Sequence, residues 1–287
     1  MKKLYVPIIT PFREDETVNY EALKKITKGL LSEGADGIYA GGSSAECFLM
    51  TMEERMKTLE TVISAADGAP VIAHIGAIGT KLSEELAVHA EKAGASMISS
   101  VPPFYFSYDF ESIKRYYWDL ADSVKLPLMI YYIPSNTSHQ LSAAQLAEIM
   151  DGRENITSIK FTSFDYYKMQ QLHEMTKKEV IGGKDEGFIS AMAMNADGAI
   201  GTTFNCYFAH YKKILSYLEN NDYKSAYEVQ CKANAITAEL CSVNLFDGVK
   251  VLLQYKGYDA GIPRRPNGRL DATSRKKLID CYKNNMI

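Results

Sequence analysis

The 287-residue sequence has no long apolar run, no surplus of basic residues and no closely spaced cysteine pair. No stretch approaches the roughly 18 to 20 apolar residues of a membrane span, so we expect no membrane helix. The 32 Lys and Arg face 35 Asp and Glu, for a formal net charge of -3, so we expect no nucleic-acid partner. The five cysteines are widely spaced and form no CxxC pair, which predicts neither a disulfide framework nor a zinc site.

The first residues, MKKLYVPIITPF, resemble a secretory signal only superficially. Pro7 and Pro11 interrupt the apolar stretch and charged residues follow at once, so we expect no signal peptide and a cytoplasmic location. Hydrophobic residues make up 46% of the chain and charged residues 23%, close to the averages of soluble globular proteins. These proportions exclude the disordered and fibrous classes.

Short apolar runs alternate with segments of helical period along most of the chain. The runs show little period-2 alternation, which is typical of parallel strands buried on both faces. They occupy residues 5–10, 36–40, 70–75, 97–101, 127–133, 156–161, 179–183 and 197–203. Eight such strand-then-helix units predict an α/β fold, a (β/α)8 TIM barrel. The competing open, doubly wound sheet is disfavoured because no GxGxxG follows the first run and no P-loop is present.

The strand signals stop near residue 220, and three further helical segments follow. They are YKSAYEVQCKANAITAELCS, GVKVLLQYKG and ATSRKKLIDCYKNN, the last preceded by GIPRRPNG. This tail is too short for an independent domain. We therefore predict a barrel over residues 1–220 and a C-terminal helical extension over 221–287 that packs on it.

In such a barrel the working groups lie at the carboxyl ends of the strands. Lys160 stands in the apolar run ITSIKF, where loss of hydration favours the neutral, nucleophilic amine. A Schiff base formed there acts as an electron sink for making or breaking a carbon–carbon bond. The alternative is a lysine that ends a strand and reaches out to water. Tyr131 ends the preceding strand and could move protons in the same cavity, or simply be a buried tyrosine bonded to a carbonyl.

Two further strand ends offer polar groups. In GGSSAE, small residues and the hydroxyls of Ser43 and Ser44 suit a carboxylate, although an ordinary strand-to-helix turn with a serine cap is an equal alternative. Asp185 and Glu186 in GGKDEGF could bind sugar hydroxyls or stabilise a helix N-terminus. A metal site is disfavoured there, because no second acidic cluster or histidine pair stands at ligand spacing.

Taken in order, the strand-end motifs resemble the pyruvate-dependent class I aldolase superfamily of dihydrodipicolinate synthase and N-acetylneuraminate lyase. The motifs are ITPF, GGSSAE, YYIP, IKFTS and NADGAIGTTFN, and the resemblance covers essentially the whole chain. It implies a (β/α)8 barrel with extra C-terminal helices and a reaction that needs neither metal nor organic cofactor.

The resemblance also implies roles for individual residues. Lys160 would be the Schiff-base lysine and Tyr131 the phenol that shuttles protons. Ser43 and Ser44 match a hydroxyl pair that holds the pyruvate carboxylate, and Ser44 keeps the hydroxyl that would link it to Tyr131. Tyr105 of PPFYF matches a tyrosine that reaches across a subunit interface toward the neighbouring site, which implies a homotetramer built as a dimer of dimers.

Within the superfamily the chain looks most like the lyase branch. The synthase branch has an arginine where YYIPSNT has Asn136, whereas GGKDE, GTTFN and KFTSFDYYKMQQL are similar to the lyase pattern. The resemblance then implies an aldolase that cleaves N-acetylneuraminate reversibly to N-acetylmannosamine and pyruvate. The residues that would hold the hydroxylated sugar chain are Thr162, Gly183, Asp185, Glu186 and Thr202.

Three positions depart from the family pattern. Ala45 and Phe164 replace glycines, and Tyr132 replaces an asparagine. Ala45 would alter a turn that glycine adopts at little steric cost, and Phe164 would either narrow the pocket or point outward. A narrowed pocket would favour an aldolase for a smaller 2-keto-3-deoxy sugar acid. Two more interpretations stay open, namely a dihydrodipicolinate synthase-like enzyme and a barrel that binds sugar acids or pyruvate without turnover.

Overall fold

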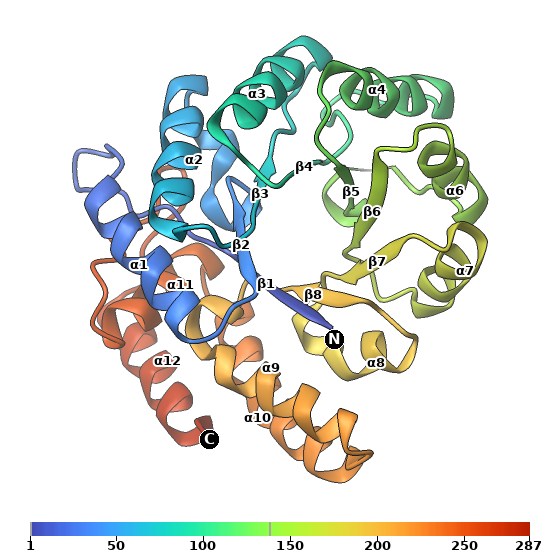
Figure 1. Cartoon of the computed structure of the whole chain (residues 1–287). Coiled ribbons are helices and arrows are strands. Elements are labelled where there is room, and N and C mark those ends of the chain that lie inside the picture. The colour runs from blue at the N-terminus through green and yellow to red at the C-terminus, as the bar shows by residue number, and fades with distance from the viewer. Residues whose placement is uncertain (1, 138) are drawn as a thin grey trace.

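The computed structural model describes residues 2–137 and 139–287, and its centre is a closed barrel of eight parallel strands joined in sequence order (Figure 1). Each strand coincides with one of the eight apolar runs, so the predicted fold class is confirmed. The strands are β1 (Lys3–Pro7), β2 (Gly37–Ala40), β3 (Val71–His74), β4 (Met97–Ser100), β5 (Leu128–Tyr132), β6 (Ile156–Phe161), β7 (Glu179–Gly182) and β8 (Gly198–Ile200).

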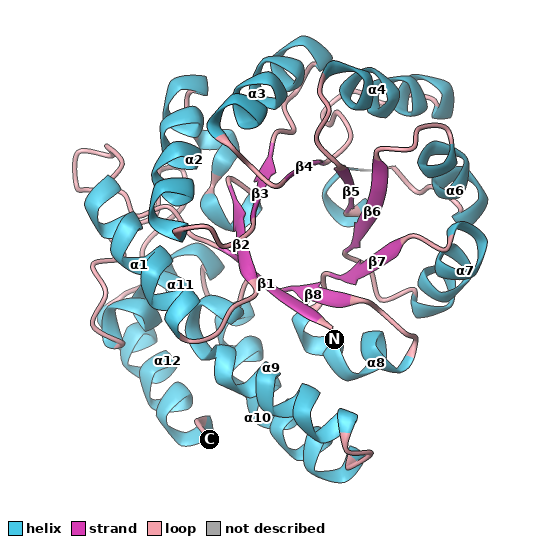
Figure 2. Ribbon diagram, in the orientation of Figure 1, coloured by secondary structure: helices cyan, strands magenta, loops and turns pink. Residues whose placement is uncertain are grey.

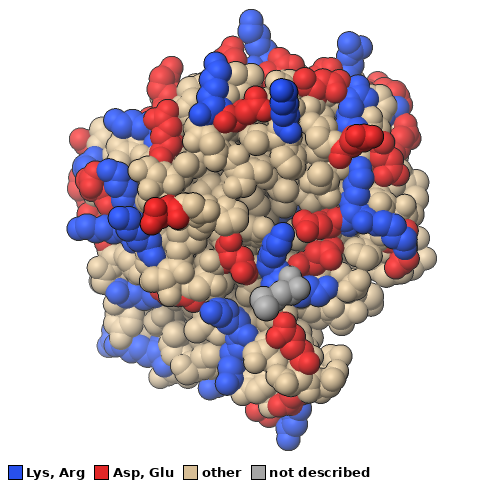
Figure 3. Space-filling view, in the orientation of Figure 1, with Lys and Arg blue, Asp and Glu red and all other residues tan. Residues whose placement is uncertain are grey.

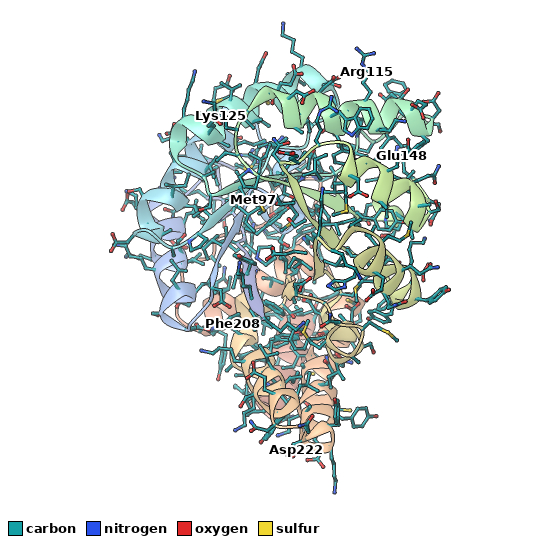
Figure 4. All side chains as sticks on the ribbon, turned by 45° about the vertical axis from the view of Figure 1, so that its right-hand side comes forward. Met97, Arg115, Lys125, Glu148, Phe208 and Asp222 are labelled. Carbon is teal, nitrogen blue, oxygen red and sulfur yellow. The ribbon has the colours of Figure 1, made fainter. Side chains whose placement is uncertain are left out.

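The strands are buried on both faces because helices surround the ring, as the secondary-structure colouring shows (Figure 2). Alternate side chains point inward and form a separate inner core that includes Tyr39, Met129, Tyr131 and Ile181. Met97, labelled near the middle of the barrel, packs against this inner core (Figure 4). The remaining strand side chains pack against the outer helices. Because both faces of each strand meet apolar surroundings, apolar and polar residues do not need to alternate along it. This accounts for the continuous apolar runs in the sequence.

Several of the surrounding helices begin at a polar residue whose side chain accepts a hydrogen bond from the first turn. Thr51 and Glu54 form a capping box at the start of one helix, and Ser142 and Gln145 form another. The helices of the barrel are α1 (Tyr20–Ser32), α2 (Met52–Ala66), α3 (Thr80–Ala93), α4 (Phe110–Ser123), α5 (Pro134–Thr137), α6 (Ala143–Asp151), α7 (Tyr166–Thr176), α8 (Phe188–Ala193) and α9 (Phe204–Glu219).

Closure of the barrel depends on a glycine in its last strand. Gly198 pairs with Lys3 where β8 meets β1. A Cβ atom at position 198 would lie 2.1 Å from the carbonyl oxygen of Lys3, so only glycine lets the two backbones approach this closely. The first and last strands can therefore form a regular parallel ladder.

Three helices follow the barrel, as predicted. They are α10 (Tyr223–Ser242), α11 (Leu245–Tyr255) and α12 (Ala272–Asn285), and α10 packs against both α9 and α12. Asp222 lies at the tip of the α9–α10 pair, which extends beyond the barrel (Figure 4). The predicted boundary at residue 220 falls between these two helices, and the division into parts stays a prediction. No helix among the described residues is long and apolar enough to cross a membrane.

The loops at the carboxyl ends of the strands contain short helical turns that periodicity does not reveal. They are α5 and the 3₁₀ turns η1 (Ser43–Ala45), η2 (Cys47–Leu49) and η3 (Asp185–Gly187). Each is too short to show a helical repeat in the sequence. On the face seen in Figure 3, basic and acidic side chains are interspersed, in keeping with the small net charge.

Candidate active site

Lys160 and Tyr131 lie side by side inside the carboxyl end of the barrel. They are register partners on the neighbouring strands β6 and β5. The Lys160 Nζ lies 3.9 Å from the centroid of the Tyr131 ring and 4.6 Å from that of Tyr39. Because the residue is only 5% exposed, the alternative of a lysine extending into bulk water is wrong. Contacts with two aromatic rings instead hold the amine in a cavity that Lys160 lines.

The turn after β2 brings the two serines to the same cavity. Ser43 and Ser44 lie in η1, and the left-handed backbone conformation falls on Glu46, with φ 57° and ψ 36°. Ala45 has no positive φ and is fully buried. The expectation that Ala45 alters a turn requiring glycine is therefore wrong, because alanine fits this conformation without steric cost.

Ser44 is bonded to the loop after the last strand of the barrel rather than to the tyrosine. Its Oγ lies 2.8 Å from the Oγ1 of Thr202, which follows β8. Among the described residues no hydrogen bond joins Ser44 to Tyr131, so the predicted link between them is absent from this structure. The contact with Thr202 instead fastens the serine turn to the loop on the other side of β1.

Asp185 lies in η3 with its carboxylate largely enclosed. Its Oδ2 accepts hydrogen bonds from the backbone N–H of Thr203 at 2.8 Å and from the Thr203 hydroxyl at 2.7 Å. Burial nevertheless raises the pKa of Asp185 to about 6, and the two hydrogen bonds oppose the shift only in part. This carboxyl group therefore titrates near neutral pH.

Helix α10 supports the turn that carries Asp185 and Glu186. The side chain of Gln230 donates to the carbonyl oxygen of Asp185 at 3.1 Å, and Asn234 donates to that of Glu186 at 3.0 Å. The Asp185 carbonyl also accepts from the backbone N–H of Phe188 within η3, so the bond from Gln230 is a second one that joins the turn to α10. The C-terminal extension consequently positions part of the site.

Thr162 follows β6 and lines the cavity, and its side-chain hydroxyl is buried. Its backbone N–H is bonded to the carbonyl of Tyr132 at 2.8 Å, whereas its Oγ1 is buried and has no partner among the described residues. A Cβ at Gly183 would lie 2.0 Å from this Oγ1, so glycine is what allows the two loops to approach. An unpaired buried hydroxyl is ready to bond a ligand, since leaving it unpaired is costly.

One cavity of about 270 Å³ collects nearly all of the predicted residues. The structure brings together residues from the loops after β2, β5, β6, β7 and β8, at the end of the barrel where working groups are expected. The predicted residues that line it are Ser43, Ser44, Tyr131, Lys160, Thr162, Gly183, Asp185, Glu186 and Thr202.

Sequence reasoning missed the contribution of the C-terminal helices and their connection. Thr237 and Cys241 of α10 line the cavity, as do Leu245 and Phe246 at the start of α11. No local signal distinguishes these positions from ordinary helical packing. Asn136, identified by its difference from the synthase pattern, also lines the cavity.

Tyr105 is the predicted site residue that does not line this cavity. It is 84% exposed, with a positive φ of 80°, and its ring packs on Phe106 with centroids 5.0 Å apart. The role across a subunit interface stays a prediction.

The two further departures from the family pattern, Phe164 and Tyr132, are not among the residues that line the cavity. Phe164 is 55% exposed and stacks under Lys184, with the Nζ 4.7 Å from the ring centroid; it does not line the cavity. Tyr132 points outward from β5, and its hydroxyl donates to the carbonyl of Leu141 at 3.3 Å. Neither side chain narrows the cavity.

The described residues contain no group of three or more His, Cys, Asp or Glu placed to hold a metal ion. All five cysteines are free, although Cys47 and Cys206 are buried. Burial raises the pKa of the Cys47 thiol to about 11, so it is an inert core residue at neutral pH.

The fold and the cavity together define an α/β-barrel protein with a buried amine and a phenol at the carboxyl ends of its strands. The hydroxyl and carboxyl groups that line the cavity suit a small, hydroxylated ligand. The chain belongs to the dihydrodipicolinate synthetase family, whose model matches residues 1–285.

Three relatives illustrate the similarity within this family. The N-acetylneuraminate lyase of Rhizobium meliloti (strain 1021) is 34% identical over 283 residues, covering 98% of this chain and 94% of that protein. An N-acetylneuraminate lyase of Clostridium perfringens is 33% identical and covers 93% of each chain. The crystal structure of CdNal from Clostridium difficile in complex with mannosamine has a TM-score of 0.96 at 30% identity, covering 100% of this chain and 99% of that one.

Proposed function

We propose that this protein is a Schiff-base aldolase that cleaves N-acetylneuraminate reversibly to N-acetylmannosamine and pyruvate. The observation that carries the proposal is Lys160, a buried residue that lines the cavity with its amine against the rings of Tyr131 and Tyr39. The similarity to N-acetylneuraminate lyases over nearly the full length supports the substrate.

The reaction begins when the amine of Lys160 attacks the C2 carbonyl of the open-chain sugar acid. Loss of water leaves an iminium ion, which accepts the electron pair of the C3–C4 bond as that bond breaks. The proton of the C4 hydroxyl passes to Tyr131, assisted by the carboxylate of the substrate. The resulting enamine takes up a proton at C3, and water hydrolyses the iminium to release pyruvate. The proposed reaction uses no metal and no organic cofactor.

The remaining cavity residues bind the substrate in this proposal. Ser43 and Ser44 hold the carboxylate through hydroxyl and backbone N–H groups that are oriented before any charge moves. The hydrogen bond between Thr202 and Ser44 fixes the orientation of the two hydroxyl groups relative to each other. The residues assigned to the hydroxylated chain are Thr162, Gly183, Asp185, Glu186 and Thr202, and the unpaired hydroxyl of Thr162 supports its assignment.

The structure favours none of the competing activities. An aldolase for a smaller keto acid is expected if Phe164 shortens the pocket, and Phe164 lies outside the cavity lining. A synthase-like enzyme needs an arginine for its second substrate, and Asn136 occupies that place. A barrel that binds the ligand without turnover is the remaining alternative, and borohydride trapping distinguishes it from an aldolase.

The proposal extends to assembly and location. We infer a homotetramer, a dimer of dimers, in which the exposed Tyr105 reaches toward the site of a neighbouring subunit. Five free cysteines support a reducing compartment such as the cytoplasm. Sedimentation tests the assembly: a fully active monomer would contradict the role of Tyr105.

Borohydride reduction in the presence of pyruvate tests the reaction class. The wild type should gain the mass of one reduced pyruvate adduct, and Lys160→Ala should gain none. Absence of an adduct at saturating pyruvate would exclude the Schiff-base mechanism and favour a non-catalytic barrel.

A substrate panel tests the identity of the sugar acid. We expect cleavage of N-acetylneuraminate, with pyruvate released in equal amount to N-acetylmannosamine. No activity on N-acetylneuraminate together with rapid cleavage of a six-carbon keto acid would overturn the assignment.

A further inference from the structure

The carboxylate of Glu46, two residues after Ser44, is completely enclosed and fully bonded. Its Oε1 lies 2.6 Å from the Nζ of Lys250 on α11. Its Oε2 accepts from the backbone N–H of Arg264 and from the side chain of Asn267, each at 2.9 Å. The side chains of Glu46 and Lys250 are 0% and 1% exposed. The turn η1, which carries Ser43 and Ser44 after β2, is thus connected to the C-terminal extension more than 200 residues away in sequence.

Lys250 is itself held in place on its other sides. Its Nζ also donates to the carbonyl oxygen of Ile262 at 2.7 Å and lies 4.7 Å from the centroid of the Phe12 ring. The ammonium is therefore positioned by groups outside the turn that carries Glu46. It acts as a stationary anchor for the carboxylate.

This buried ion pair is poorly explained as a source of stability. Removing two charges from water costs about as much as their attraction returns, and apolar residues often replace such pairs without loss of stability. Glu46 also adopts a left-handed backbone conformation, which a non-glycine residue holds only when its surroundings impose it. The burial of the ion pair and the left-handed backbone of Glu46 both indicate that the pair holds the turn at Glu46 in one conformation rather than adding to the stability of the fold.

The turn transmits the position of Glu46 to the serines. Only Ala45 separates Glu46 from Ser44, and the backbone N–H of Glu46 donates to the carbonyl oxygen of Ser43 at 2.9 Å. A second bond, from Ala45 N–H to the Gly42 carbonyl at 3.0 Å, closes the same short 3₁₀ turn. A shift of the Glu46 carboxylate would therefore move the serine hydroxyls as well.

We propose that Glu46 and Lys250 are positioning residues that orient Ser43 and Ser44 for the carboxylate of pyruvate, with the C-terminal extension as the anchor. This inference rests on the proposed function, because it assigns the serines to that carboxylate. Neither Glu46 nor Lys250 reacts with the substrate. Their effect is specific to ligands that carry a carboxylate.

The test compares Schiff-base formation by pyruvate and by acetone, a ketone that lacks the carboxylate. In Lys250→Met, we expect the pyruvate concentration for half-maximal borohydride trapping to rise about tenfold or more, because a misplaced binding group loses much of its effect. Trapping at saturating pyruvate should still reach one adduct per subunit. The acetone concentration for half-maximal trapping should change by less than about twofold, because acetone does not use the serines.

Lys256→Met is the matched control. Lys256 lies just after the same helix and pairs with Glu33 at 2.8 Å, away from the cavity, so its loss also removes an anchor of α11. We expect this variant to keep the wild-type preference for pyruvate over acetone. A preference lost equally in both lysine variants would overturn the inference, because the effect would then be a general loosening of α11.

Two further variants keep the test decisive if Lys250→Met does not fold. Glu46→Gln combined with Lys250→Met removes both charges and leaves an amide oxygen for Arg264 and Asn267. Asn267→Ala removes one bond to Glu46 at a half-buried position and should reduce the pyruvate preference by a smaller factor.

The outcomes separate this inference from the proposed function. If pyruvate forms no adduct with the wild type, the proposed function fails. If the wild type is trapped and the folded Glu46, Lys250 and Asn267 variants all keep its preference for pyruvate, the positioning role is wrong and the aldolase assignment stands.

Discussion

Replacing Asp185 with asparagine should change how the stability of this protein depends on pH. Asp185 is buried, and its pKa is raised from 3.8 to about 6, chiefly by desolvation. Asparagine keeps an oxygen that accepts from Thr203 and removes the titrating proton. The difference in unfolding free energy between wild type and variant therefore isolates this one group.

The sign follows from the direction of the shift. A carboxyl whose pKa is higher in the folded state binds its proton more tightly there, so it stabilises the protein below pH 3.8. That stabilisation is lost as the pH rises to about 6. The full difference between the two pKa values corresponds to about 3 kcal/mol. Between pH 8 and pH 5 the wild type should gain about 1.4 kcal/mol relative to Asp185→Asn.

Urea unfolding of both proteins at pH 5, 6, 7 and 8 measures this quantity. Protein concentration must be the same throughout, because assembly would otherwise alter the apparent stability. The remaining carboxyl groups titrate in both proteins and cancel in the difference. A difference that is constant from pH 5 to pH 8 would refute the reasoning, since Asp185 would then have an ordinary pKa despite its burial.

Three further substitutions test the site and the barrel. Tyr131→Phe keeps the ring beside Lys160 and removes the phenol, so kcat for cleavage should fall by about 100- to 10,000-fold while borohydride trapping with pyruvate persists. Ala45→Gly should lower the unfolding free energy by at least about 0.5 to 1 kcal/mol in urea, because glycine adds freedom to the unfolded chain at a position without positive φ and the change removes a buried methyl group. Gly198→Ala should lower the thermal midpoint strongly, with a loss of about 3 kcal/mol or more, because its Cβ meets the backbone of Lys3.

For each of these substitutions, one outcome would contradict the prediction. An unchanged kcat in Tyr131→Phe would mean that another group moves the C4 proton. A more stable Ala45→Gly would mean that the turn does require a glycine conformation. Gly268→Ala is the control for the barrel, because a Cβ there has no neighbour within 4 Å in the part of the chain that the structure describes. Equal midpoints for the alanine variants at 198 and 268 would contradict the close β8–β1 approach.

The outcomes at individual residues show where sequence reasoning succeeds. Lys160 could be identified because a charged side chain in an apolar run contradicts its local surroundings, and such a contradiction is visible without a structure. The 3₁₀ turns around the cavity are too short to leave a periodic signal in the sequence. For this reason the sequence suggests a strained turn at Ala45, whereas the residue with the left-handed conformation is Glu46. Among the described residues, the Ser44 hydroxyl is bonded to Thr202, 158 residues away, and not to Tyr131, a pairing that no local pattern in the sequence could indicate.

The sequence by itself determined the eight strands, the helices between them, the three added helices and the residues at most strand ends. These features depend on the spacing of apolar residues within one strand or helix, and that spacing can be read from a short stretch of sequence. Only the tertiary structure decided which groups share the cavity, including Phe246 and Thr237 from the extension and the enclosed Glu46–Lys250 pair. Such contacts join residues far apart in the chain, and they exist only once packing has excluded water and brought the segments together.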